Sequence, residues 1–93
     1  MMLVELVQVK ETRGSYRLNK IWINPKHIVY ISEDTRIKHS LREGADLGLV
    51  PETTFSSIRL NEGGFQTIIS VVGDPEMIES KIFTKQKKNI LRG

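Results

Sequence analysis

Hydrophobic residues concentrate in five short stretches of the chain, most of which alternate apolar and polar positions as half-buried β-strands do. The stretches cover residues 2–9, 15–23, 27–31, 53–60 and 65–72. In the first stretch, apolar side chains fall on both faces, which indicates a central strand or one that meets a partner subunit. The pattern therefore predicts a mostly antiparallel sheet of about five strands.

Turn-forming residues separate these stretches. Gly14 closes the polar link between the first two, and the pair Asn24-Pro25 ends the second, because proline removes a backbone donor. Between the fourth and fifth stretches lies Asn61-Glu62-Gly63-Gly64, which is typical of a hairpin turn.

A helix is predicted after the last strand. Asp74 suits the N-cap, Pro75 the first helical position, and Glu76 the positive end of the helix dipole. We expect a short helix that packs on the sheet through one side, lined by Met77, Ile78, Lys81 and Ile82.

Residues 34–52 form a long insertion between the third and fourth strands. Such a length without secondary structure is unusual in a compact domain, so we expect residues 35–43 to form two helical turns. Asp34 would be the N-cap and Gly44 the stop, with a loop over residues 45–52. Because long loops commonly serve binding, the insertion is the candidate recognition segment.

Two sets of side chains in this insertion suit a ligand or partner. Cations around the predicted helix would hold an anion, and apolar residues of the following loop would supply apolar contact. The cations are Arg36, Lys38, His39 and Arg42, and the apolar residues are Leu47, Leu49 and Val50. Because Glu33, Asp34 and Glu43 flank the cations, a solvated helix of mixed charge is the alternative.

The net charge of +3 comes from the C-terminus. Residues 84–93 hold four cations and no acid, whereas the other 83 residues carry ten Lys and Arg against eleven Asp and Glu. We therefore predict one domain over residues 1–83 and a basic tail over 84–93, which is either a solvated end or a phosphate contact. In a nucleic-acid-binding alternative the contacts would be Lys85, Lys87, Lys88, Arg92, Arg59 and Trp22. Trp22 and Tyr16 share a strand face, and packing in the core or against a subunit would equally explain that pair.

Composition argues against several function classes. The absence of cysteine excludes disulfides, thiolate metal sites and a cysteine nucleophile. There is no apolar run of membrane-spanning length, and Glu5 interrupts the apolar start, so we expect a cytoplasmic protein without membrane contact. His27 and His39 have no partners for a zinc set, and no phosphate-loop, nucleophile-elbow or zinc-protease motif occurs. We predict no catalytic residue, no metal and no cofactor; a small hydrolase is the remaining alternative.

Three segments carry a resemblance to known proteins. Residues 23–31 read Ile-Asn-Pro-Lys-His-Ile-Val-Tyr-Ile, residues 57–63 read Ser-Ile-Arg-Leu-Asn-Glu-Gly, and residues 72–78 read Val-Gly-Asp-Pro-Glu-Met-Ile. In this order they resemble small phage-encoded β-rich proteins of uncharacterised function and, more distantly, the flagellar FlbD/SwrD-like family. The insertion departs from the flagellar pattern. The resemblance implies a fold without catalytic residues and, if it extends to the phage proteins, an accessory protein in the host cytoplasm.

Together these observations predict a single α+β domain: a five-stranded, mostly antiparallel sheet, a C-terminal helix and a long, partly helical insertion between strands three and four. The predicted function is a non-catalytic binding module. It would be a phage accessory protein that inhibits host or defence machinery by capturing a host protein or sequestering an anionic nucleotide. We expect a homo-oligomer, because a chain of 93 residues buries a limited core and neighbouring subunits could enclose a ligand together.

Overall fold

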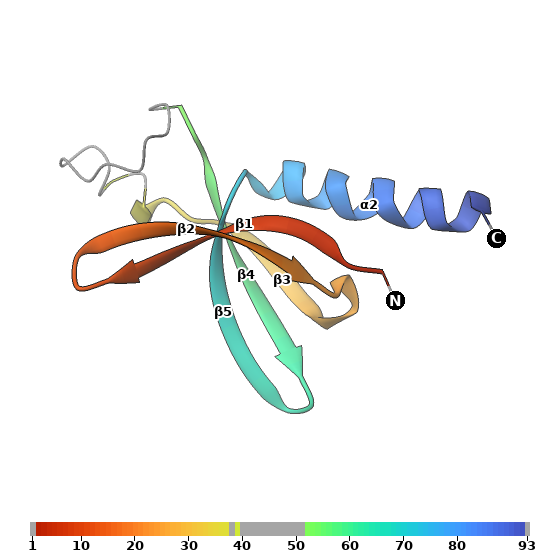
Figure 1. The fold of residues 1–93 in the computed structure, drawn as a ribbon, viewed down its shortest axis with the longest axis horizontal. Helices are drawn as coiled ribbons and strands as arrows, with labels where there is room; N and C mark the ends of the chain where they lie inside the picture. The colour runs from red at the N-terminus through yellow and green to blue at the C-terminus, as the bar shows by residue number, and fades with distance from the viewer. Residues whose placement is uncertain (1, 38, 40–51, 93) are drawn as a thin grey trace.

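Five strands and a C-terminal helix make up the fold (Figure 1). The computed structural model describes residues 2–37, 39 and 52–92, and of residues 85–92 it describes the backbone only. The elements are β1 (Val4–Thr12), β2 (Ser15–Ile23), the 3-10 turn η1 (Pro25–His27), β3 (Ile28–Glu33), β4 (Phe55–Glu62), β5 (Phe65–Val72) and α2 (Pro75–Arg92). The predicted five-stranded antiparallel sheet with a C-terminal helix is confirmed.

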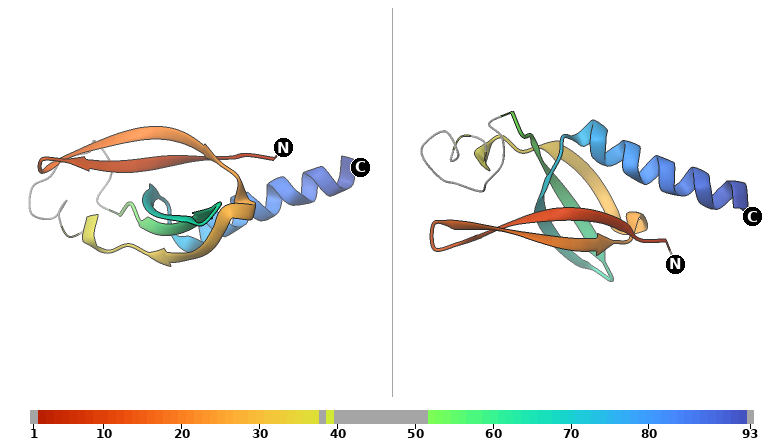
Figure 2. Two further views of the ribbon diagram at one scale, coloured as in Figure 1. Left: turned by 90° about the horizontal axis from the view of Figure 1, so that it is seen from below. Right: turned by 45° about the horizontal axis from the view of Figure 1, so that its top comes forward.

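The strands form one sheet in the order β2-β1-β5-β4-β3, and every neighbouring pair is antiparallel. The β1–β2 hairpin is joined to β5 by only two residue pairs, Gln8 with Val71 and Val9 with Ser70. This narrow junction lets the hairpin lie across the other three strands as a second layer (Figure 2). The outermost strands, β2 and β3, are linked through residues 24–27, a stretch that spans at most about 18 Å, so the sheet must curl.

Both hairpins turn through two residues with positive φ. These are Arg13 (52°) and Gly14 (81°) in the first, and Gly63 (59°) and Gly64 (92°) in the second. Two successive positive φ angles define the type I′ turn, whose twist matches that of the flanking strands. The hairpin predicted at Gly63-Gly64 is therefore confirmed.

An apolar core lies between the two layers. We call it the inner cluster: Val4, Leu6, Ile23, Ile58, Val71 and Ile78. It takes residues from β1, β2, β4, β5 and α2, so the helix and both layers share one core. Leu60 packs against this cluster, as expected from its place on the same face of β4 as Ile58.

A second apolar group lies on the opposite face of the sheet. This outer cluster consists of Val9, Ile37 and Phe55, with Tyr16, Leu18 and Val72 packed against it. Strand β1 contributes Leu6 to the inner cluster and Val9 to the outer one, which confirms that it is a central strand buried on both faces.

Helix α2 begins where the sequence predicts. The Met77 N–H donates to Asp74 Oδ1 at 2.8 Å, the expected cap hydrogen bond. Ile78 is buried and Ile82 packs beside it, but Met77 is exposed, because the buried stripe follows the i, i+4 spacing of the two isoleucines. The helix continues to Arg92 and so runs through the basic segment (Figure 1). No helix among the described residues is both long and apolar enough to span a membrane.

Gly73 makes the turn from β5 into α2. It is buried and has a φ of +112°, a backbone conformation that is strained for any residue with a side chain. Its N–H donates to the Thr54 carbonyl at 2.8 Å, and its carbonyl accepts from the Ser56 hydroxyl at 2.7 Å. These bonds fix the backbone, so the turn cannot relax easily.

We expect Gly73→Ala to lower the free energy of unfolding by about 1–3 kcal/mol, the cost of a strained φ. The added Cβ would lie 3.4 Å from Ile78 Cδ1, an ordinary contact, so backbone strain rather than a clash sets the loss. Urea denaturation measures the difference, and Ser80→Ala on the exposed side of α2 is the control. Equal stabilities of the two variants would show that the turn is not strained.

Candidate functional site

Three serines stand side by side on the outer face of β3, β4 and β5. Ser32 pairs with Ser57 across β3 and β4, and Ser57 pairs with Ser70 across β4 and β5. The Ser70 hydroxyl donates to Asp34 Oδ2 at 3.0 Å. Within the described part of the chain, the hydroxyls of Ser32 and Ser57 form no hydrogen bond. This serine row therefore offers two hydroxyl groups to a ligand.

An open depression of about 570 Å³ lies over the serine row. Ile68 borders it on β5, and Glu33, Asp34 and Arg36 border it at the end of β3. Arg36 and Ser70 also line an adjoining hollow of about 240 Å³. The larger volume falls within the range of small-molecule sites. Arg36 is therefore the cation common to both hollows.

Asp34 is a buried carboxylate that organises this end of the sheet. Its Oδ1 accepts from the Arg36 backbone N–H at 3.1 Å and from Arg36 Nε at 3.4 Å. Its Oδ2 accepts from Arg36 Nη2 at 3.2 Å and from the Ser70 hydroxyl. The Asp34 side chain is only 2% exposed, whereas that of Arg36 is 79% exposed. The pair thus fixes a guanidinium at the surface by means of a buried anion.

The pKa of Asp34 lies below its ordinary value. Burial is the largest influence and acts to raise the pKa, but hydrogen bonds from Arg36 and Ser70, together with the charge of Arg36, outweigh it. Asp34 therefore stays ionised at neutral pH, and its carboxylate is a weak base there.

Asp34 also begins the insertion. Its acceptance of the Arg36 backbone N–H is the predicted N-cap interaction. The His39 N–H donates to the Thr35 carbonyl at 3.0 Å, which closes one helical turn. The Asp34 N–H in turn donates to the Phe55 carbonyl at 2.9 Å, so both ends of the insertion are joined at the sheet. The rest of the predicted helix and loop lies outside the described residues.

A partly exposed aromatic ring adjoins the serine row. Tyr30 pairs with Arg59 across β3 and β4, and Arg59 pairs with Ile68 across β4 and β5. The Arg59 guanidinium carbon lies 5.4 Å from the centre of the Tyr30 ring, within the range of a cation–π contact. Tyr30 is 47% exposed and Ile68 is 53% exposed. Arg59 Nε is buried and has no acceptor among the described residues, so ring contact rather than a hydrogen bond holds this group.

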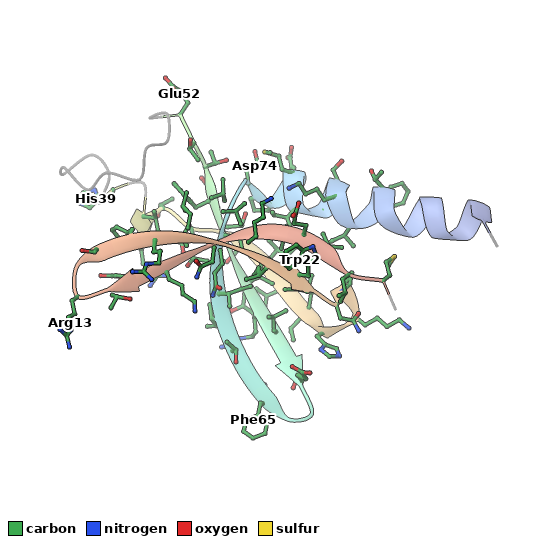
Figure 3. All side chains as sticks on the ribbon, in the orientation of Figure 1. Arg13, Trp22, His39, Glu52, Phe65 and Asp74 are labelled. Carbon is green, nitrogen blue, oxygen red and sulfur yellow. The ribbon has the colours of Figure 1, made fainter. Side chains whose placement is uncertain are left out.

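Only some of the predicted ligand-binding residues lie in the part of the chain that the structure describes. Arg36 lines the depression. His39, which closes the helical turn that begins at Thr35, is exposed (Figure 3). The remaining predicted contacts lie outside the described residues: Lys38, Arg42, Leu47, Leu49 and Val50. The structure thus brings one predicted cation to a described hollow.

The residues of the nucleic-acid alternative are spread over several elements. Arg59 lies on β4 and Trp22 is exposed on β2, and two strands lie between β2 and β4 in the sheet order. Tyr16 packs against the outer cluster, so it does not form an exposed pair with Trp22. Trp22 is 57% exposed, so it does not pack in the core formed by the described residues. The backbone of α2 carries Lys85, Lys87, Lys88 and Arg92, whose side chains are not described.

Sequence reasoning missed five residues as members of one surface: Tyr30, Ser32, Ser57, Ile68 and Ser70. Each is an ordinary strand residue, and only the cross-strand register brings them together. No group of three or more potential metal ligands occurs among the described residues.

The chain matches no family model, and comparisons with curated proteins and with solved structures found no match either. The resemblance to phage and flagellar proteins therefore stays a prediction.

Proposed function

We propose that the chain is a non-catalytic binding module that sequesters a phosphate-bearing ligand in the depression over the serine row. The observation that carries this proposal is the exposed guanidinium of Arg36, which Asp34 holds at the edge of a 570 Å³ hollow. Charge-assisted hydrogen bonds from arginine are well suited to phosphate, and the hydroxyls of Ser32 and Ser57 add neutral donors.

The chemistry of Asp34 favours binding over catalysis. A hydroxyl nucleophile needs a base whose pKa is close to the working pH. Asp34 is the carboxylate that contacts the Ser70 hydroxyl, and its pKa is lowered, so it would activate that serine poorly. A hydrolase that uses this pair is accordingly the weaker alternative.

The insertion would extend this site. In the proposal, Lys38, His39 and Arg42 hold the anion together with Arg36, while Leu47, Leu49 and Val50 supply apolar contact or meet a second subunit. If the resemblance to phage proteins holds, the module would act in the host cytoplasm as an inhibitor that withholds a ligand from host or defence machinery. Capture of a host protein by the same surface is the competing proposal.

We expect pyrophosphate to shift the backbone amide resonances of Arg36, Ser57 and Ser70 in a titration followed by two-dimensional NMR of the labelled protein. Arg36→Ala should weaken this binding about tenfold or more, because it removes the charged donor at the hollow. Arg17→Ala removes an exposed arginine from β2 and is the matched control. Shifts that spare the serine row, or equal affinities of the two variants, would refute the proposed site.

The same titration examines the nucleic-acid alternative, which the continuation of α2 through the basic segment favours. Single-stranded oligonucleotides should then shift the backbone amide resonances of residues 85–92. Their affinity should fall steeply as the salt concentration rises. The combined variant Lys85→Gln, Lys87→Gln, Lys88→Gln and Arg92→Gln would abolish that binding. Pyrophosphate binding at Arg36 should not change in this variant.

A further inference from the structure

A flat, partly apolar surface lies directly beside the serine row. We call it the aromatic shelf: Tyr30 on β3, Arg59 on β4 and Ile68 on β5. Arg59 lies over the Tyr30 ring, and the exposed parts of Tyr30 and Ile68 face solvent. A planar guanidinium packed on an aromatic ring beside an aliphatic side chain is a common platform for planar, weakly polar rings. The surface thus combines a stacking plane with the positive charge of Arg59.

The strand geometry orders three kinds of surface along one direction. Same-face residues on a strand are about 6.8 Å apart, twice the rise per residue. The aromatic shelf, the serine row and the Asp34–Arg36 pair therefore follow one another along β3 over about 13 Å. This order runs from a stacking surface, through neutral hydroxyls, to a cation held by Asp34. An extended nucleotide presents the same order: base, ribose and phosphate.

We propose that the ligand of the depression is a nucleotide whose base stacks on the aromatic shelf, whose ribose lies over Ser32 and Ser57, and whose phosphate reaches Arg36. This inference rests on the proposed phosphate-binding function and names its ligand class. The depression of 570 Å³ has room for the ribose and the phosphate, and the base would lie beside it, where Ile68 is shared by the depression and the shelf. The serine hydroxyls can both donate to and accept from ribose hydroxyls.

Glu33 is the opposing charge in this arrangement. It lines the depression next to Asp34, and its carboxylate would repel a phosphate. Asp34 repels the phosphate less than Glu33 does, because Arg36 and Ser70 already donate hydrogen bonds to its buried carboxylate. We therefore expect Glu33→Gln to bind the nucleotide about two- to fivefold more tightly, as the removal of one exposed like charge would produce.

The test compares ADP with pyrophosphate on the whole chain by calorimetry or NMR. ADP should bind about tenfold more tightly than pyrophosphate, because base stacking adds to the phosphate contact. Tyr30→Ala should remove that advantage and leave pyrophosphate binding unchanged, whereas Tyr30→Phe should retain it. Phe65→Ala is the matched control: Phe65 is an aromatic residue outside the shelf and is 82% exposed at the tip of the β4–β5 hairpin (Figure 3).

The possible failures are distinguishable. If pyrophosphate and ADP bind equally well, and Tyr30→Ala changes neither affinity, the base-stacking inference is overturned while the phosphate-binding module stands. If neither probe binds at Arg36, the proposed function fails and the inference fails with it. If a single-stranded oligonucleotide binds at Tyr30 far more tightly than ADP, the ligand is a strand and the mononucleotide assignment is overturned.

Discussion

Phe55→Ala is expected to lower the free energy of unfolding by about 3–5 kcal/mol, the usual cost of removing a buried phenyl ring. The Phe55 side chain is 1% exposed at the start of β4, where it packs with Val9 and Ile37. Small domains have a total stability of about 5–15 kcal/mol, so the variant would be close to unfolding at room temperature. Urea denaturation followed by circular dichroism would measure the loss.

Two further variants make this prediction decisive. Phe65→Ala removes the same ring from an exposed hairpin tip, and we expect it to change stability by about 0.5 kcal/mol or less. Phe55→Leu keeps most of the buried volume and should give a folded protein of intermediate stability. Similar losses for Phe55→Ala and Phe65→Ala would mean that the outer cluster does not form in solution.

Phe55 matters for the candidate site because it fixes the base of the insertion. Its side chain holds Ile37 against the sheet, and its carbonyl accepts the Asp34 N–H. Both ends of the insertion therefore depend on the outer cluster. We expect Phe55→Leu to weaken pyrophosphate binding as well as stability, because the position of Arg36 relative to the serine row depends on this packing.

Local sequence signals predicted the elements well. The strand at residues 15–23 and the strand at 65–72 have the bounds expected from alternation, and Asp74 and Asp34 both cap helical turns. These features depend on neighbours within about four residues, which a single sequence displays directly. Arg36 was predicted from equally local information, as one of the cations around the expected helix over residues 35–43.

The serine row could not be predicted from local sequence, because its prediction requires the pairing register of three strands. Ser32, Ser57 and Ser70 lie on three strands, and their adjacency follows from a register that side-chain pattern alone does not specify. The link between β1 and β5 is equally non-local, since the strands lie at opposite ends of the sequence. The exposure of Met77 also follows from tertiary packing, because Ile78 enters the core where the chain leaves Gly73.

Asp34→Ala is expected to lower the free energy of unfolding by about 2–4 kcal/mol, through the loss of a helix cap and of the buried acceptor for Arg36 and Ser70. The partners supply a graded comparison. Ser70→Ala removes one hydrogen bond and should cost about 1 kcal/mol. Arg36→Ala takes the cation from the buried Asp34 carboxylate, but the backbone N–H of residue 36 and the Ser70 hydroxyl still donate to it, so this variant should cost about 1–3 kcal/mol. If Asp34→Ala were no more harmful than Arg36→Ala, Asp34 would not be the organising residue.

The pH dependence of stability isolates the charge of Asp34 from its shape. Because folding lowers the pKa of this carboxyl, ionised Asp34 stabilises the fold above its unfolded-state pKa of about 3.9. That stabilisation is lost as the pH falls through the lower, folded-state pKa. Wild-type protein should therefore lose more stability between pH 5 and pH 2 than Asp34→Asn, whose amide keeps the shape without titrating. Parallel acid titrations of the two proteins would mean that folding does not lower the pKa of Asp34 and that its charge does not contribute to stability.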